Sequence, residues 1–356
     1  MIETRRRRYV AFAPGAFATR AAKTAHGVIS YAADATVAVV DPLHAGKRVR
    51  DVLPYLDSDA PIVAGVADSL AYAPTSLLIG IAPQGGKLPD EYRSEIALAL
   101  RNRLEVVNGL HTLLGEDPEF RALADRHDAR IWDLRLPPAA PLFSGAAYDV
   151  RAKVVLTVGS DCAVGKMTAA LELTKAATEA GADAAFVATG QTGIAIAGWG
   201  TAVDRVVIDF APGAAEQLVL EGDRRAHDIL FVEGQGGINH PAYAPVTFAL
   251  LFGAAPDALV LVHMAARTHI EGYDAPILGY RELIRSYEAT CATVKPARVV
   301  AIALNTFGLD DDAARAAIAA AREQTGLPCD DVVRFGPHAL YAAFAPGLSK
   351  TSVRRA

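Results

Sequence analysis

Short apolar runs alternate with amphipathic segments along the first half of the chain. The apolar runs predict buried strands at residues 35–41, 61–65, 76–82, 104–111 and 129–135. Residues 90–103 carry apolar positions at helical spacing and acidic residues in the first turn, which predicts a helix, and 118–128 predicts another. This alternation indicates a parallel sheet that is covered by helices on both faces.

The second half repeats the alternation more clearly. The strands expected there are 153–159, 183–190, 204–210, 228–234, 257–263, 297–305 and 330–336. Helices fill most of the gaps, and 311–326 is an example with an acidic start and a glycine stop. In open parallel sheets, ligands bind outside the carboxyl ends of the strands. We therefore expect the glycines and polar residues that follow these strands to form the functional site.

The richest proline stretch, residues 135–153, lacks helical periodicity and predicts a linker. A chain of 356 residues is long enough for two domains with separate cores. We therefore predict an α/β protein with one domain at 1–140 and a second at 150–356. No GxGxxG pattern follows the first strand, so a nicotinamide site in the first domain is not supported.

Composition restricts the partners of the protein. A net charge of −5 and a pI near 6.0 argue against nucleic acid as the main partner. No run of about 18 uncharged apolar residues occurs, so no membrane span is expected. We expect a small molecule, an amino acid or a carboxylate, as the ligand, and a homo-oligomer as the state of the protein.

Two features bear on the compartment. The start "RRRRYVAFAPGAFATRAA" weakly resembles an export signal, but Pro14 interrupts its apolar run and Arg20 ends it. A first strand behind a solvated basic tail is the favoured interpretation. Cys162, Cys291 and Cys329 cannot form a framework of paired disulfides and have no CxxC spacing. We expect a reducing, cytoplasmic setting.

The segment "VVLTVGSDCAVGKMTAALEL", residues 154–173, predicts a strand, a glycine-bounded loop and a helix. Backbone N–H groups, a helix N-terminus and Lys166 together suit a phosphate. Gly159 and Gly165 alone would fit a plain turn, but the lysine favours phosphate binding. The loop residues expected to contact the cofactor are Gly159, Ser160, Asp161, Cys162, Ala163, Val164, Gly165, Lys166, Met167 and Thr168.

The loop departs from the usual phosphate-binding loop after its lysine. The usual loop has Ser or Thr there, whose hydroxyl holds Mg²⁺. Here Met167 follows Lys166, and Thr168 lies about 100° further around the helix. A thioether is a poor ligand for Mg²⁺. Either Asp161, Glu233 and water hold the metal, or no metal is essential.

Cys162 lies within this loop and has two interpretations. It is either a nucleophile or a small residue tolerated beside a phosphate. The second is favoured, because no partner base is identifiable from the sequence.

Several residues after the later strands are candidates for substrate binding and chemistry. The segment 191–200 is too rich in glycine for a helix interior, so Gln191 and Thr192 lie either in a site loop or in a structural turn. Asp209, at the end of the strand expected at 204–210, binds a substrate amine or metal-bound water, or caps the next helix.

Two further candidates follow the strands at 228–234 and 257–263. His240 is a general base or a structural residue. Arg267 is a carboxylate clamp or a surface ion pair. His263 and His269 lack the spacing of a helical metal pair. In the first half, Lys23 and "PQGGK" (83–87) either bind an anion or form a plain turn.

The loop spacing carries a first resemblance. Five residues separate Gly159 from Gly165 where four are usual, and "GSDCAVGKMT" resembles the loop of dethiobiotin synthetase and its relatives. "FVEGQGGINHP" (231–241) is similar to the Val-Glu-Gly segment of that group. The resemblance implies that Glu233 helps to organise metal and phosphate. It also implies that Asn305, in "IALNT", reads a nucleotide base and is a further cofactor-binding residue.

A second resemblance covers nearly the whole chain. It rests on the segments 14–31, 78–93, 106–114, 159–173, 188–216 and 232–243. These resemble a bacterial and archaeal family long catalogued as a domain of unknown function, with a Rossmann-like N-terminal part and a P-loop C-terminal part. The resemblance implies D-glutamate N-acetyltransferase activity that uses acetyl-CoA ahead of an enolase-type partner enzyme. Coenzyme A carries a pyrophosphate, which the loop and Lys166 can grip without a catalytic metal.

These observations favour an N-acetyltransferase that moves acetyl from acetyl-CoA to the amine of a small amino acid, an acidic D-amino acid in particular. Lys166 and the loop would bind the cofactor phosphates, His240 or Glu233 would be the base, and Arg267 would bind the substrate carboxylate. The alternative is an ATP- and Mg²⁺-dependent ligase or kinase similar to dethiobiotin synthetase. A third interpretation is a nucleotide-responsive binding protein without turnover.

Overall fold

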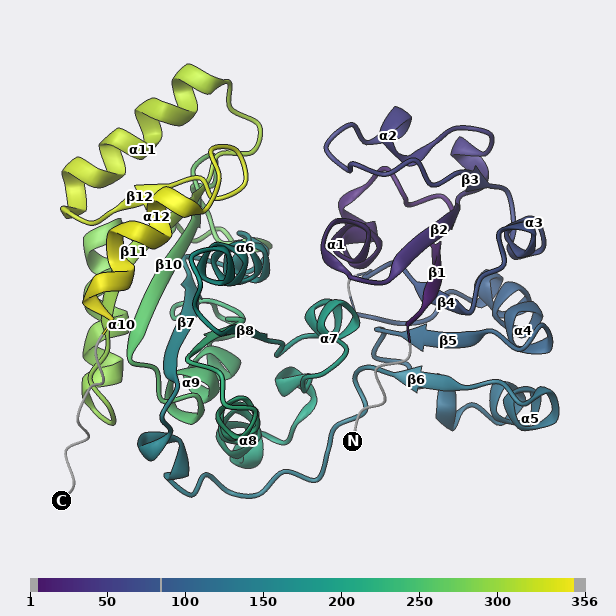
Figure 1. Ribbon diagram of the computed structural model, residues 1–356, viewed down its shortest axis with the longest axis horizontal. Coiled ribbons are helices and arrows are strands. Elements are labelled where there is room, and N and C mark those ends of the chain that lie inside the picture. The colour runs from purple at the N-terminus through teal and green to yellow at the C-terminus, as the bar shows by residue number, and fades with distance from the viewer. Residues whose placement is uncertain (1–5, 84, 349–356) are drawn as a thin grey trace. The chain divides into compact units, whose positions relative to one another are not determined.

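The computed structural model describes residues 6–83 and 85–348, which form two compact units (Figure 1). The first unit comprises Met1–Leu136 and Gly190–Arg205, and the second comprises Pro137–Thr189 and Val206–Ala356. Each unit is built on a six-stranded parallel sheet. The predicted α/β class is therefore confirmed. The chain passes from one unit to the other three times, and the sequence gives no sign of the short return at 190–205.

The first sheet has the strand order β3-β2-β1-β4-β5-β6. Its strands are β1 (Arg8–Phe12), β2 (Ala35–Val40), β3 (Ile62–Val63), β4 (Ser76–Ile79), β5 (Glu105–Asn108) and β6 (Ile131–Asp133). The helices of this part are α1 (Lys23–Tyr31), α2 (Val49–Val52), α3 (Val66–Ser69), α4 (Arg93–Arg101) and α5 (Pro118–His127). The five strands and two helices predicted for this half are all present.

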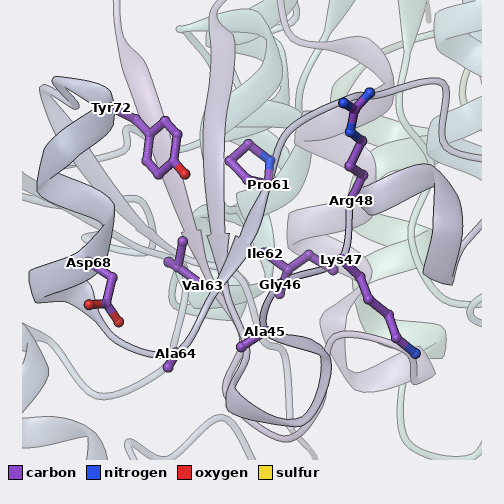
Figure 2. Close-up of a pocket in the computed structure, with 10 residues that line it drawn as sticks. All are labelled: Ala45, Gly46, Lys47, Arg48, Pro61, Ile62, Val63, Ala64, Asp68 and Tyr72. Carbon is purple, nitrogen blue, oxygen red and sulfur yellow. The ribbon is translucent and has the colours of Figure 1, made fainter.

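A hollow of about 460 Å³ lies beside β3, at the edge of the first sheet (Figure 2). Its polar lining comes from Lys47, Arg48, Asp68 and Tyr72. None of the residues that the sequence predicts for the functional site lines this hollow.

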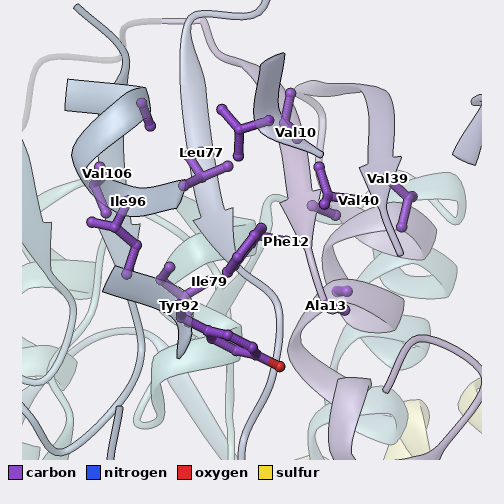
Figure 3. Packing of buried hydrophobic residues seen from close by; sticks show 14 of the residues in the cluster. Val10, Phe12, Ala13, Val39, Val40, Leu77, Ile79, Tyr92, Ile96 and Val106 are labelled. Atoms are coloured by element: carbon purple, nitrogen blue, oxygen red, sulfur yellow. The ribbon is translucent and has the colours of Figure 1, made fainter. Parts of the chain in front are cut away.

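Apolar side chains from β1, β4 and the following helices form the core of the first unit (Figure 3). Phe12 is fully buried, and its ring meets that of Tyr92 edge to face at a centroid distance of 4.9 Å. Burial of a side chain of this size stabilises the fold by about 2–3 kcal/mol. The Tyr92 hydroxyl donates to the Pro14 carbonyl at 2.9 Å, so its polar end is also satisfied.

The basic N-terminal segment is only partly solvated. Residues 1–5 lie outside the described part of the chain. Arg7, which was expected in a solvated tail, is instead buried, and its Nε donates to Glu105 Oε2 at 2.6 Å. Its guanidinium also lies over the ring of Trp132. A buried arginine needs such a partner because an unpaired buried charge is strongly unfavourable.

The second sheet has the strand order β12-β11-β10-β7-β9-β8. Its strands are β7 (Lys153–Gly159), β8 (Ala184–Val187), β9 (Ile229–Val232), β10 (Ala258–Met264), β11 (Arg298–Asn305) and β12 (Cys329–Asp330). Its helices are α6 (Lys166–Glu179), α8 (Ala211–Arg224), α9 (Ala244–Gly253), α10 (Tyr280–Ala292), α11 (Asp311–Thr325) and α12 (His338–Phe344). Because the sheet is parallel, the loops after β7, β9, β10 and β11 all leave from one edge.

The strand predicted at 204–210 is wrong. This segment forms two 3-10 turns, Val203–Arg205 and Ile208–Phe210, that lead into α8. Val207 and Ile208 are exposed, at 65% and 55%, and no strand of either sheet pairs with them. An apolar β-branched run becomes a strand only where it can pair with a neighbouring strand and pack its side chains against another element.

The loop predicted at 191–200 is also wrong. Residues Gln191–Ala197 form α7, which packs against α1 within the first unit (Figure 1). Gly193 lies inside this helix at a cost of about 1 kcal/mol relative to alanine. Burial of Ile194 and Ala195 offsets that cost, so tertiary packing outweighs the local helix propensity.

In the part of the chain that the structure describes, every helix is too short or too polar to cross a membrane.

Candidate active site

The loop between β7 and α6 is shaped to receive an anion. Ala163 and Gly165 have positive φ angles, of 52° and 112°. The N–H groups of residues 163–168 have no acceptor among the described residues. Unsatisfied donors at the start of a 14-residue helix suit a phosphate.

Lys166 completes the cationic side of the loop. Its Nζ is buried and donates to the carbonyls of Asp161 and Gly236, each at 2.7 Å. Burial lowers the pKa of Lys166 to about 8, while the nearby Asp161 and Glu233 carboxylates oppose that shift. A phosphate oxygen would offer this ammonium a full negative charge in place of two neutral carbonyls.

The segment after β9 crosses directly beneath the loop. Glu233 Oε2 accepts a hydrogen bond from the Thr189 N–H at 3.0 Å, and the Thr189 hydroxyl donates to the Glu233 carbonyl at 2.8 Å. The Gly234 N–H donates to Thr157 Oγ1 at 3.0 Å. A Cβ at Gly234 would lie 1.7 Å from the Thr157 carbonyl oxygen, so only glycine fits where this segment passes β7.

Tyr287, on α10, ties the two segments together. Its hydroxyl donates to the Gly159 carbonyl at 2.6 Å and accepts from the Ile238 N–H at 3.1 Å. The side chain is fully buried, which raises the pKa of its hydroxyl. The sequence does not single out this residue, because a tyrosine in an amphipathic helix has no distinguishing pattern.

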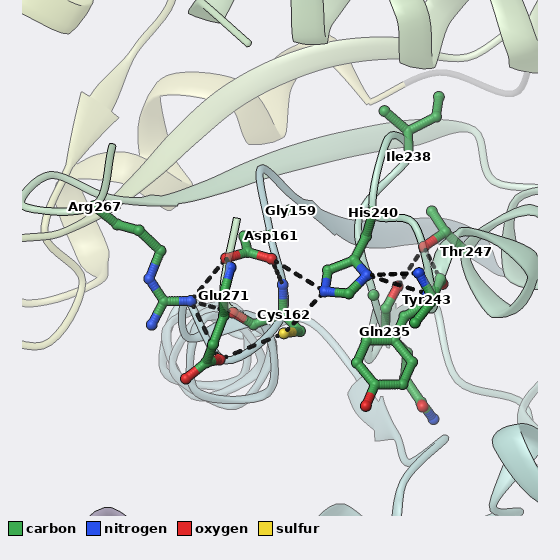
Figure 4. A network of polar contacts seen from close by, with 12 residues as sticks. Gly159, Asp161, Cys162, Gln235, Ile238, His240, Tyr243, Thr247, Arg267 and Glu271 are labelled. Atoms are coloured by element: carbon green, nitrogen blue, oxygen red, sulfur yellow. Dashed lines mark hydrogen bonds and ion pairs between the residues drawn. The ribbon is translucent and has the colours of Figure 1, made fainter. Parts of the chain in front are cut away.

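A polar network surrounds Asp161 (Figure 4). Its Oδ1 accepts from the Cys162 N–H at 2.7 Å. Its Oδ2 accepts from Arg267 Nη1 at 2.9 Å and from the Glu271 N–H at 2.8 Å. Arg267 therefore braces the loop from the segment after β10. Its Nε and Nη2 have no acceptor among the described residues, so these two nitrogens can bind an anion.

Asp161 and the residue after Lys166 do not favour a Mg²⁺ ion. Asp161 is already satisfied by a guanidinium and two backbone N–H groups, and a cation there would face Arg267. Glu233 is bonded to the Thr189 backbone. Magnesium needs hard oxygen ligands in near-octahedral geometry, and the position after Lys166 supplies a thioether instead.

The Cys162 thiol is hydrogen-bonded to a carboxylate. Its Sγ is 3.7 Å from His240 Nε2 and donates to Glu271 Oε2 at 3.4 Å. Burial, together with the charges of Asp161 and Glu271, raises the pKa of the Cys162 thiol to about 12. A thiol is an effective nucleophile only as a thiolate. The geometry thus favours the interpretation of Cys162 as a small loop residue.

We expect Cys162 to be alkylated slowly by iodoacetamide at neutral pH. A pKa near 12 leaves about a thousandth of the thiolate of an ordinary cysteine. The rate should rise about tenfold for each pH unit between pH 7 and pH 10. Mass spectrometry of a C291A/C329A protein isolates this thiol, and rapid labelling at pH 7 would contradict the assignment.

His263 supports the other side of the loop. Its Nδ1 lies 2.8 Å from Ser160 Oγ, and its ring meets Tyr280 edge to face. Burial lowers the pKa of His263 to about 4, and Arg267 adds to that shift. The ring is therefore neutral at physiological pH.

The unfolding free energy should fall as the pH drops below about 6.5. Between that value and about 4, the unfolded chain takes up a proton at His263 that the folded protein excludes. At pH 5 this amounts to about 2 kcal/mol. Urea unfolding at pH 7 and pH 5 should show a smaller pH dependence in H263Q than in the wild type. The exposed His269 gives the control H269Q, and equal pH dependence in all three proteins would contradict the assignment.

Asn305 lies at the end of β11, against the loop. Its Nδ2 donates to the Val164 carbonyl at 3.1 Å, and its Oδ1 accepts from the Phe307 N–H at 3.0 Å. The side chain thereby joins β11 to the loop. The reading of a base by Asn305 stays a prediction.

Gln191 and Thr192 bond within the first unit rather than to the network around Asp161. Gln191 Oε1 accepts from Arg135 Nη2 at 2.7 Å, and Arg135 also pairs with Asp204. The Thr192 hydroxyl lies 3.0 Å from that of Thr24. Arg135 is a buried cation that the sequence did not single out.

Asp209 does not lie at the end of a strand, as predicted. It is exposed in the turn before α8, makes no hydrogen bond or ion pair with a described residue, and does not cap the helix. The false strand at 204–210 caused this error.

The other cationic candidates lie in the first unit. Lys23 is exposed at the start of α1, and Lys87 is exposed after a turn closed by the Gly86 N–H and the Pro83 carbonyl. Gln84, within that predicted segment, lies outside the described residues.

The fold and the loop define an α/β protein with a Rossmann-like N-terminal domain and a P-loop C-terminal domain. The chain belongs to the DUF1611 family. Residues 42–137 match its Rossmann-like domain of unknown function, and residues 141–341 match its P-loop domain.

Relatives with names or structures agree with this membership. A D-glutamate N-acetyltransferase of Pseudoalteromonas is 36% identical over 75% of this chain and 80% of its own length. One of Tritonibacter scottomollicae is 37% identical over 76% of this chain and 81% of its own length. The crystal structure of a DUF1611 family protein from Anabaena variabilis is 41% identical, with a TM-score of 0.91 over 96% of this chain and 99% of that one.

Proposed function

We propose that the protein is an N-acetyltransferase that moves acetyl from acetyl-CoA to the amine of a small, acidic D-amino acid. The observation that carries this proposal is a phosphate-binding loop with unsatisfied N–H donors and a buried lysine but without a fitting magnesium ligand. Such a loop suits the pyrophosphate of coenzyme A, which needs binding but no cleavage. The names of the two relatives support the same activity.

In the proposed reaction, the neutral amine nitrogen attacks the thioester carbonyl carbon. The new C–N bond forms, the C–S bond breaks, and its electron pair leaves on the sulfur of coenzyme A. The amine loses a proton to a base, and the thiolate gains one from solvent. The raised pKa of Cys162 argues for direct transfer between the two substrates rather than through an acetylated cysteine.

In this proposal, residues of the second unit bind acetyl-CoA. The N–H groups of 163–168 and the Lys166 ammonium bind the pyrophosphate oxygens. Arg267 adds two guanidinium nitrogens beside the loop for a further anionic oxygen.

The alternative function is an ATP-dependent ligase or kinase that acts on a small carboxylate. The position of Glu233 beside Lys166, after β9, favours it, because this is the place of the metal-organising carboxylate in such enzymes. That reaction needs a divalent metal and releases ADP or AMP, so the two functions give different products.

A free-thiol assay with acetyl-CoA tests the proposal. We expect thiol release with D-glutamate in the presence of EDTA, and little release with L-glutamate or without an amine. The N-acetyl product should be found by mass spectrometry. Release of ADP or AMP from ATP and Mg²⁺, with no thiol release for any amine, would overturn the proposal in favour of the alternative.

A further inference from the structure

His240 is held so that one of its ring nitrogens can only accept hydrogen bonds. The side chain is 1% exposed and lies at the turn into α9 (Figure 4). Its Nδ1 is 3.1 Å from the Ala242 nitrogen and 3.2 Å from the Tyr243 nitrogen. Both nitrogens are backbone N–H donors that never lose their hydrogen. Nδ1 must therefore carry the lone pair, and the neutral ring carries its proton on Nε2.

The Nε2–H group points toward the phosphate-binding loop. It lies 3.7 Å from Cys162 Sγ and 3.7 Å from Asp161 Oδ1. The Cys162 hydrogen is directed to Glu271, so the sulfur presents a lone pair to His240. Neither contact is a strong hydrogen bond. The ring thus holds its Nε2–H donor beside the loop. The contacts of this donor with Cys162 and Asp161 satisfy it only weakly.

This tautomer limits what His240 can do. Nε2 has no lone pair with which to accept a proton from an amine or from Cys162. It also cannot ligate a metal, although Asp161, Cys162 and His240 place one ligand atom each within 4.8 Å of one another. What remains is donation of a hydrogen bond.

We propose that His240 is a permanent, neutral Nε2–H donor that binds a phosphate oxygen at the loop, and that it is not the general base. The proposal rests on the proposed use of acetyl-CoA. When the pyrophosphate occupies the loop, the long pantetheine chain carries the thioester away from Lys166 and its neighbours. His240 lies against Asp161 and Cys162 of that same loop, so it meets the phosphate end of the substrate.

The charges around the ring agree with a neutral histidine. Burial lowers the pKa of His240, and Lys166 lowers it further, while Asp161 and Glu271 raise it. Cys162, Tyr243 and Tyr273 also face the ring. The role of Glu233 as the base for the amine stays a prediction.

Two acetyl donors distinguish phosphate binding by His240 from a role in the chemical step. Acetyl-CoA carries the phosphates, and S-acetylpantetheine carries the same thioester without them. We expect H240F to raise the KM for acetyl-CoA at least tenfold with little change in kcat, and to leave the reaction with S-acetylpantetheine within about twofold of the wild type. In H240Q the side-chain amide keeps a donor and should recover part of the loss. An equal loss of kcat with both donors would overturn the proposal.

A second measurement remains valid if acetyl transfer itself fails. In protein labelled with ¹⁵N-histidine, NMR at pH 7.5 should show Nδ1 unprotonated and Nε2 protonated. Inorganic pyrophosphate should shift the Nε2–H resonance in the wild type, and H240F should bind pyrophosphate more weakly by calorimetry. A proton on Nδ1, or equal pyrophosphate affinity in wild type, H240F and H240Q, would overturn the phosphate role whatever reaction the protein performs.

Discussion

The variant K166M should bind coenzyme A and acetyl-CoA at least about a hundredfold more weakly than the wild type while keeping its fold. A buried charge-assisted contact to a phosphate contributes about 2–5 kcal/mol, and each 1.4 kcal/mol is a factor of ten in affinity. In the absence of phosphate, Nζ only bonds two neutral carbonyls. Loss of the ammonium leaves these two carbonyls without a donor, at about 1–3 kcal/mol each, so the fold of K166M must be checked separately.

Isothermal calorimetry measures this difference, with urea unfolding as a check on the fold. Lys175 lies on the same helix and is exposed, so K175M is the matched control and should bind normally. Unchanged affinity for coenzyme A in a folded K166M protein would mean that the loop does not hold the phosphates.

The variant G234A should lose at least about 3 kcal/mol of unfolding free energy, more than most core substitutions. The new methyl carbon would meet the Thr157 carbonyl at 1.7 Å. Thr157 is on β7, which is bonded to a strand on each side, so the carbonyl cannot move aside. The Glu233 segment would have to shift away from Lys166 instead, and binding should fall with stability.

Urea unfolding compares G234A with G279A. A Cβ at Gly279 meets only the Glu282 carboxylate, at an ordinary 3.6 Å, and its backbone is extended. That variant should stay within about 0.5 kcal/mol of the wild type. A G234A protein as stable as G279A would show that the segment does not pass β7 as described.

The hydrophobic pattern of the sequence predicted most of the fold, because most helices and strands are specified by the residues within them. β7 and β10 are buried on both faces, so their continuous apolar runs are distinctive. The phosphate-binding loop is recognisable for the same reason, since its glycines and lysine are contiguous. The errors occurred where contacts with neighbouring elements determine the secondary structure. The apolar run at 204–210 lacks a partner strand, and α7 depends on α1 for its packing.

The site was only partly predictable, because its decisive contacts join distant parts of the chain. Asp161 and Arg267 were both candidates, but their ion pair joins residues far apart in sequence. The hydrogen bonds of Tyr287 and the tautomer of His240 depend on backbone groups that no motif encodes. Residue types could be predicted from the sequence, whereas their partners, and hence their roles, came from the fold.

The central claim is that the loop holds the phosphates of coenzyme A without a metal, and thermal unfolding tests it most directly. Six samples contain coenzyme A or acetyl-CoA, each with and without EDTA, ATP with Mg²⁺, or ATP with EDTA. A ligand at about 100 times its Kd adds roughly 2.7 kcal/mol of stability, which raises the midpoint measurably. We predict a clear rise with both coenzyme A species that EDTA does not alter. A rise only with ATP and Mg²⁺ would contradict the account and favour the ligase or kinase.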